Sequence, residues 1–349
     1  MLAKLRGPLA DGAALPALLA AFAVGAIVLA IGGIDPITGY SALINGVFEE
    51  TNLPYVVAAL APVLGMAVSF AIPFRMQEFN LGGDGQLVIG GITGAGVALA
   101  LPDWGLLTFA LAALAAALAG GLLAAISAPL LLRGRVPVII STLLLGFPAV
   151  SLASYLARYP LADEGSGTPQ TERLPVDMRL PSLGDWSPYV NTGLIVILLV
   201  FVAYWVVDAR TTTGLDLRVV GANPRFGRYA GVNVPSLLTL SLAASGAIAG
   251  LVGALLVAAP PYRFIDGALT VPGYTFTGVT VAMLSRGRPA ALFAAALLFT
   301  ALQVGGTGME RDVGVPRQLT AIIQASVVIT FVVIVAARSR RARAKAGLR

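Results

Sequence analysis

A cluster of charged, amide and glycine residues interrupts an otherwise apolar part of the sequence, in the stretch FRMQEFNLGGDGQLVIGG at 74–91. A charged side chain at the centre of a bilayer costs roughly 2.5–3.5 kcal/mol on insertion scales, so such groups must face protein or water. Carboxylates and amides in that setting can hydrogen-bond a polar solute or join neighbouring helices. The cluster consists of Arg75, Glu78, Asn80, Asp84 and Gln86, with glycines at 82, 83 and 85.

Two interpretations of this cluster stay open. In the first, the residues lie on an inner loop between two helices, where Arg75 and Glu78 are structural. In the second, the segment is a broken helix near a solute pathway, where the glycines allow tight backbone turns and Asn80, Asp84 and Gln86 line the route.

Several kinds of chemistry are excluded by residue type. The sequence contains no cysteine and no histidine, which removes thiolate and imidazole metal sites and histidine-based acid–base pairs. It also lacks the G-x-x-x-x-G-K-[ST] phosphate loop, and its acidic residues form no paired motif. We therefore expect no catalytic residues, no metal and no cofactor. The remaining apolar segments lack the isolated ionisable residues of a proton or sodium relay, which fits a neutral, polar solute.

Composition identifies the elements that must position the cluster. The chain has 349 residues, 57% of them hydrophobic and 11% charged, with a mean hydropathy of +0.87. A helix needs about 20 apolar residues to cross a bilayer. We count about ten candidate runs, which predicts an all-α polytopic membrane protein. They are 13–33, 54–73, 86–101, 105–127, 136–156, 190–207, 236–258, 272–284, 289–306 and 318–337, of which 86–101 and 272–284 are short enough to be half-helices.

The distribution of positive charge predicts the orientation. If both termini are cytoplasmic, most of the 23 basic residues fall in inner segments, as the positive-inside rule requires. The basic tail at 338–349 resembles a nucleic-acid arm in composition, but beside a final helix we expect it to contact anionic lipid headgroups. We therefore predict membrane lipids and no nucleic acid as its partners.

The chain is predicted to form a single transmembrane domain over 1–349. Halves at 1–156 and 190–337 flank a polar external loop at 157–189, which is either a partly ordered connector or part of a docking surface. Five helices on each side are consistent with an inverted repeat. The break at 74–85 and the stretch APPYRFIDGALTVPGYTFTG at 259–278 each follow the second helix of a half.

Aromatic residues surround that second stretch. Tyr262, Phe264, Tyr274 and Phe276 could stack on a flat solute, so we name Tyr274 and Phe276 as pathway candidates. Interfacial anchoring of aromatic side chains is the alternative.

The inner loop at 208–235 contains the signals of a short helix. Asn223 suits an N-cap, Pro224 the first helical position, and Gly231 a left-handed stop. Phe226 and Tyr229 would share one face of this helix. So short a helix needs something to rest against. It either packs on the chain's own helices or fits a cleft on a cytoplasmic protein.

Three stretches carry a family resemblance. FNLGGDGQLVIGG, TTTGLDLRVVGANPRFGRYAGV and SGAIAGLVGALL, in this order and spacing, resemble the permease subunits of bacterial ABC importers in the branched-chain amino acid, ribose and nucleoside superfamily. The likeness covers about 55–335. The F-N-L-G-x-x-G-Q form is most similar to the nucleoside or simple-sugar branch.

The resemblance implies partners and a cellular location. Such permeases pair with themselves or with a related chain, bind two cytoplasmic ATPases, and receive solute from an extracytoplasmic binding protein. Here it implies a multi-pass protein of the bacterial cell membrane. The coupling helix on the ATPase would comprise Asn223, Pro224, Arg225, Phe226, Arg228, Tyr229 and Gly231. A self-contained secondary carrier and a purely structural scaffold remain as alternatives.

Overall fold

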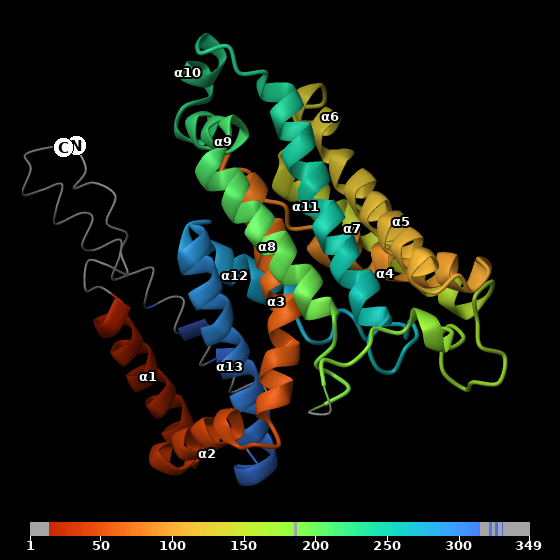
Figure 1. The fold of residues 1–349 in the computed structure, drawn as a ribbon. Helices are drawn as coiled ribbons and strands as arrows, with labels where there is room; N and C mark the ends of the chain where they lie inside the picture. Colours follow the sequence, from red (N-terminus) through yellow and green to blue (C-terminus); the bar gives the residue numbers. More distant parts are fainter. Residues whose placement is uncertain (1–13, 185–186, 315–320, 323–324, 327–329, 331–349) are drawn as a thin grey trace, which may run out of the picture. The chain divides into compact units, whose positions relative to one another are not determined.

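The structure is a computed structural model that describes residues 14–184, 187–314, 321–322, 325–326 and 330 (Figure 1). Across these residues the regular elements are helices, and extended residues meet only in isolated β-bridges such as Ala162 with Thr171. The all-α prediction is therefore confirmed. Most of the predicted span at 318–337, and all of the basic tail at 338–349, lie outside the described residues.

Six helical segments in the described part are long and apolar enough to cross a bilayer, which confirms a polytopic membrane protein. A seventh is added if α1 (Ala14–Ile31) and α2 (Pro36–Phe48), which bend by 117° at their junction, form one span. The total of ten spans and the cytoplasmic termini stay predictions. The six are α3 (Leu53–Phe74), α5 (Leu106–Ala125) with its continuation α6 (Ser127–Leu132), α7 (Val138–Arg158), α8 (Gly193–Arg210), α11 (Val234–Val257) and α13 (Pro289–Val313).

Shorter helices complete the fold. The predicted half-helices are α4 (Gly83–Ala100) and α12 (Tyr274–Ser285), while α9 (Thr212–Ala222) and α10 (Pro224–Tyr229) lie in the inner loop. The predicted outer loop holds a 3₁₀ turn, η2 (Val176–Met178). No sequence pattern predicted α2 and α9.

The chain divides into two compact units. Unit 2 (57–296) is built around α4, α5 and α11, which pack along much of their lengths (Figure 1). Glycines allow this approach, since a methyl group on Gly250 would overlap the carbonyl oxygen of Ala116, and one on Gly90 would overlap Gly250. The small residues at 90 and 250 therefore serve helix packing.

Unit 1 combines 1–56 with 297–349. Its described core contains Leu29, Leu43 and Met309. A methyl group on Gly46 would lie 2.8 Å from Cα of Gly308, so α2 and the second half of α13 touch through glycine backbone.

Within unit 2, polar segments gather at its two ends. Figure 1 shows α9 and α10 at one end and the segments 159–184 and 187–192 at the other. The candidate functional residues lie on α10, at the helix break between α3 and α4, and at the start of α12.

Candidate functional site

The short helix α10 has the caps that its sequence predicts. Oδ1 of Asn223 accepts hydrogen bonds from the backbone amides of Arg225 (3.0 Å) and Phe226 (3.1 Å), and Pro224 is the first helical residue. Gly231 has φ +85°, in the left-handed region that favours glycine. The predicted helix is confirmed, while its binding role stays a prediction.

The aromatic side chains of α10 face outward. Phe226 is 60% exposed and Tyr229 is 92% exposed, and Arg225 and Arg228 are exposed beside them. Gly227 is buried against Val220 of α9. In this unit the helix thus rests on α9 by its glycine face and presents an aromatic and basic surface to the exterior.

Helix α9 is firmly attached to the body of unit 2. Its Leu217 and Val220 are buried in an apolar cluster with Met76, Leu238 and Leu242, among others. Gly221 faces the backbone of residue 75, where a methyl group would overlap the carbonyl oxygen of Arg75. A movement of α9 would therefore displace the backbone at the end of α3.

The break between α3 and α4 contains a closed amide pair. Nδ2 of Asn80 donates to Oε1 of Gln86, and Nε2 of Gln86 donates to Oδ1 of Asn80, both at 2.9 Å. Asn80 also donates to Oγ of Ser245 on α11 at 2.9 Å and accepts from the backbone amide of Gly82. Asn80 is 3% exposed and Gln86 is 1% exposed. In this conformation the pair joins the start of α4 to α11.

Backbone contacts reinforce this break. The amide of Leu81 donates to Oγ1 of Thr142 on α7 at 3.1 Å. A methyl group on Gly82 would lie 2.5 Å from the carbonyl oxygen of Thr142, and one on Gly85 would overlap Cα of Gly146. The glycines thus allow α4 to begin directly against α7, as the tight-backbone interpretation predicts. Burial raises the pKa of the nearby Glu78 carboxyl.

Asp84 lies in the first turn of α4 and meets the start of α12. It is half-buried, and the helix dipole favours a negative charge there. The neighbouring Gly83 faces Thr275, whose Cγ2 would lie 2.7 Å from an added methyl group. Farther along α12, Gly278 lies against Met66 of α3.

The other pathway candidates lie on the same short helix. Tyr274 is the first residue of α12 and is half-buried, while Phe276 is 74% exposed. The structure therefore brings Asp84 near the start of α12 and leaves Asn80 and Gln86 in a separate, closed pair.

An ion-pair network lies at the α9 end of unit 2. Nη2 of Arg75 is 2.7 Å from Oδ2 of Asp208, and Nη1 of Arg218 is 3.2 Å from Oδ1 of the same carboxylate. Nη1 of Arg75 also donates to the carbonyl oxygen of Arg286 at 3.2 Å, and the hydroxyl of Tyr204 donates to that of Gly287. We call Arg75, Asp208 and Arg218 the Arg75 network.

One interpretation of the sequence gave Arg75 a structural role on an inner loop, and no sequence pattern identified its partner. A partial signal was available, because Arg75 and Asp208 each follow an apolar run of the sequence. Two such charges can pair only if their spans end on the same side of the membrane, which depends on the topology. The pairing itself required the fold.

Backbone hydrogen bonds attach the predicted outer loop to the stretch at 258–264, at the end of α11. The amides of Thr171, Leu174 and Leu180 donate to the carbonyl oxygens of Phe264 (3.0 Å), Tyr262 (2.8 Å) and Ala258 (3.0 Å), respectively. Ion pairs join Arg263 to Asp163 and Arg158 to Asp266. The guanidinium of Arg179 lies 4.9 Å from the ring centroid of Tyr262, and Phe264 is buried.

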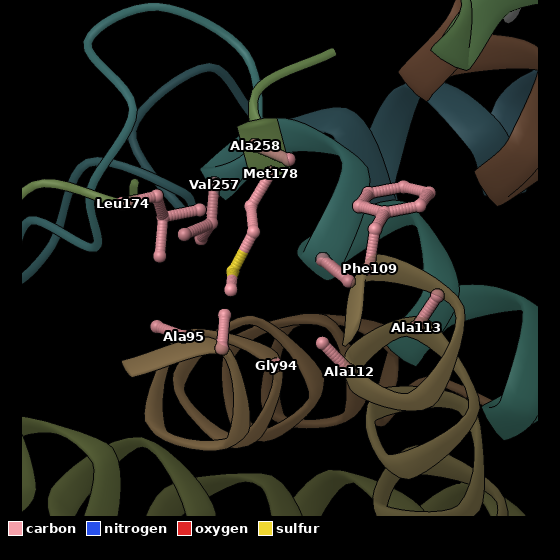
Figure 2. A pocket seen from close by; sticks show the side chains of 11 residues that line it. Gly94, Ala95, Phe109, Ala112, Ala113, Leu174, Met178, Val257 and Ala258 are labelled. Carbon is pink, nitrogen blue, oxygen red and sulfur yellow. The ribbon is translucent and has the colours of Figure 1, made fainter. Parts of the chain in front are cut away.

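Beneath this loop is a small apolar cavity (Figure 2). Met178 reaches down from η2 towards Gly94 and Ala95 of α4 and Ala112 of α5. The cavity measures about 10 Å³, which is room for one water-sized molecule. The Met178 side chain holds the loop against α4 and α5, and the cavity is too small for an organic solute.

Taken together, these features define a polytopic helical membrane protein with broken helices in its interior and a capped surface helix at one end. Residues 52–337 match the family described as the permease component of the branched-chain amino acid transport system. The chain belongs to this family. It is a multi-pass protein of the cell membrane and a transport component, not itself an enzyme.

Curated relatives agree over nearly the whole chain. The chain is 33% identical to a glucose ABC transporter permease protein of Haloferax volcanii, over 93% of this chain and 87% of the relative. It is 33% identical to a guanosine ABC transporter permease protein of Bacillus subtilis, over 90% and 91%. A nucleoside ABC transporter permease protein of Lactococcus lactis is 29% identical over 91% and 89%.

Proposed function

We propose that this chain is the membrane permease subunit of an ATP-driven importer for nucleosides or related sugar-like solutes. The observation that carries the proposal is the capped helix α10 with its exposed aromatic pair, in a chain of the permease family. The named solutes of the relatives, guanosine, nucleosides and glucose, share a hydroxyl-rich sugar or ribose. A neutral solute of this kind suits a chain without an ionisable relay.

In this proposal α10 docks on a cytoplasmic ATPase. Phe226 and Tyr229 fill a cleft of the partner, and Arg225 and Arg228 approach acidic groups at its rim. Asn223, Pro224 and Gly231 fix the ends of the helix and so preorganise this surface. A second permease subunit and an extracytoplasmic binding protein complete the assembly.

The solute pathway is proposed to pass the meeting point of α4 and α12. Asp84, Tyr274 and Phe276 lie there. The amide pair of Asn80 and Gln86 lies next to this point, at the start of α4. In another state of the transport cycle the amides would exchange their mutual hydrogen bonds for bonds to solute hydroxyl groups.

Co-purification tests the proposal. The tagged protein is extracted in mild detergent from its native cell, and we expect it to bring an ATPase and a second permease chain. Replacing Phe226 and Tyr229 by Ala should lower ATPase recovery by at least about tenfold, because buried aromatic anchors dominate such interfaces.

The matched control is Tyr155→Ala with Tyr159→Ala, which removes an exposed aromatic pair at the outer end of α7, where the two ring centroids are 5.0 Å apart. This variant should retain the ATPase. Recovery of the chain alone would instead favour a self-contained carrier.

A further inference from the structure

We propose that the Arg75 network transmits movement from α9 and α10 to α12, so that Arg75, Asp208 and Arg218 are positioning residues of the transport cycle. This inference rests on the proposed function, because it assumes that an ATPase pushes on α10. The network itself is observed within unit 2 and consists of two ion pairs that share one carboxylate.

The first step runs from α10 to the network. Gly227 of α10 packs on Val220 of α9, and Arg218 of α9 reaches Asp208 at the end of α8. Arg218 also donates to the carbonyl oxygen of Asp208. A displacement of α10 therefore moves the cation that holds one side of the Asp208 carboxylate.

The second step runs from the network to α12. Arg75 joins Asp208 to the carbonyl oxygen of Arg286, in the turn between α12 and α13. Arg286 and Gly287 have φ of +53° and +66°, and Tyr204 holds the carbonyl oxygen of Gly287. This strained turn is thus fixed from the side of α8 by two side chains.

The third step follows α12 itself. The helix has 12 residues, and its other end places Thr275 against Gly83 at the start of α4. A rigid shift of α12 therefore reaches the region where Asp84, Tyr274 and Phe276 lie. The contacts form one continuous chain of packed groups from the surface helix to the helix break.

Burial of the charged side chains suits this role. The side chains of Arg75 and Asp208 are 12% and 8% exposed, so their attraction is weakly screened by solvent and the pair tends to move as one piece. An open apolar groove of about 360 Å³ adjoins Tyr204, Asp208 and Leu217, between α8, α9 and α11.

The test compares two neutralised ion pairs in the intact complex. Arg75→Gln alone would leave Asp208 buried without its partner and could prevent folding, so the informative variant is R75Q with D208N, which removes both charges. The control is R158Q with D266N, which neutralises the 2.8 Å pair at the opposite end of the same unit.

Amide hydrogen exchange of α9, α10 and α12 is measured on each purified complex with and without ATP. In the wild type and the control we expect ATP to change exchange in all three helices. In R75Q with D208N the change should persist in α9 and α10 and fall by about fivefold or more in α12. An unchanged ATP response of α12 in this variant would overturn the inference, whereas a wild-type chain that recovers no ATPase would overturn the proposed function.

Discussion

Asn80 and Gln86 satisfy each other's hydrogen bonds at the point where α4 begins. Each amide has two donors and two acceptor sites, and a buried amide without partners is costly. The reciprocal pair uses one donor and one acceptor of each, and Ser245 and the amide of Gly82 use more. This arrangement explains how a helix break buried in the protein can be polar and still closed.

Asn80→Ala should therefore destabilise the protein. The substitution strands the Gln86 side chain and the amide of Gly82, and each stranded group costs about 1–3 kcal/mol, while Ser245 keeps its contact with the hydroxyl of Ser69. We expect a clear fall in thermal stability in detergent. Asn52→Ala, which removes an exposed amide bonded to Glu49, should have little effect. Equal stabilities of the two variants would contradict the account.

The residue types of this cluster could be predicted from the sequence, but its pairing could not. Polar groups in an apolar chain must find partners, which made the stretch at 74–91 conspicuous. Whether Asn80 meets Gln86, a helix or a solute depends on the path of the chain through the break. Gln77, with φ +63°, has a conformation that no sequence pattern indicated.

Local signals decided how well individual helices were predicted. The ends of α10 could be read from the sequence because caps act within three or four residues. The helix α9 was missed because TTTGLDLRVVGA mixes β-branched residues and glycine with charge, and its stability comes from burial of Leu217 and Val220. The helix α2 was missed as well, although Asp35 and Pro36 form a regular start, with the amide of Thr38 bonded to Asp35.

Helix packing makes Gly250 intolerant of a side chain. Gly250→Ala would push α11 away from the Ala116 carbonyl oxygen of α5, and overpacking of this kind costs about 1–3 kcal/mol. We expect a lower unfolding temperature and a smaller folded yield. Fluorescence-detected size-exclusion chromatography after heating measures both.

The matched control for this prediction is Gly146→Ala on α7. There the nearest heavy atom, the backbone nitrogen of Gly85, would be 3.8 Å from the added methyl group, which is an ordinary contact. Alanine also favours the helix over glycine, so this variant should be as stable as the wild type or slightly more so. A tolerant Gly250 would show that α5 and α11 are less closely packed than described.

At the scale of the whole molecule, the proposed function requires separate sources of energy and specificity. The chain lacks the phosphate loop of an ATPase, and its relatives are named as permease proteins of ABC transporters. In the proposed function, energy enters through α9 and α10, and solute contacts are made near the start of α12. The Arg75 network lies between these two places.

Uptake should therefore depend on ATP and not on an ion gradient. In vesicles containing the full complex, we expect uptake of radiolabelled guanosine or glucose only with hydrolysable ATP at the α10 side. Ionophores should not reduce it. Uptake by the chain alone that collapses with an ion gradient would identify a secondary carrier.

The predicted outer loop is attached to the stretch that follows α11, and this has a consequence for any protein that binds at that end of unit 2. Segment 159–184 is held by backbone hydrogen bonds, the ion pair of Asp163 with Arg263 and the buried Met178, so its shape exists before an encounter. A binding protein would meet a preorganised surface, so little conformational entropy would be lost in ordering the loop. Contacts made on this surface would therefore contribute to the affinity for a delivery partner without being offset by the cost of ordering the loop.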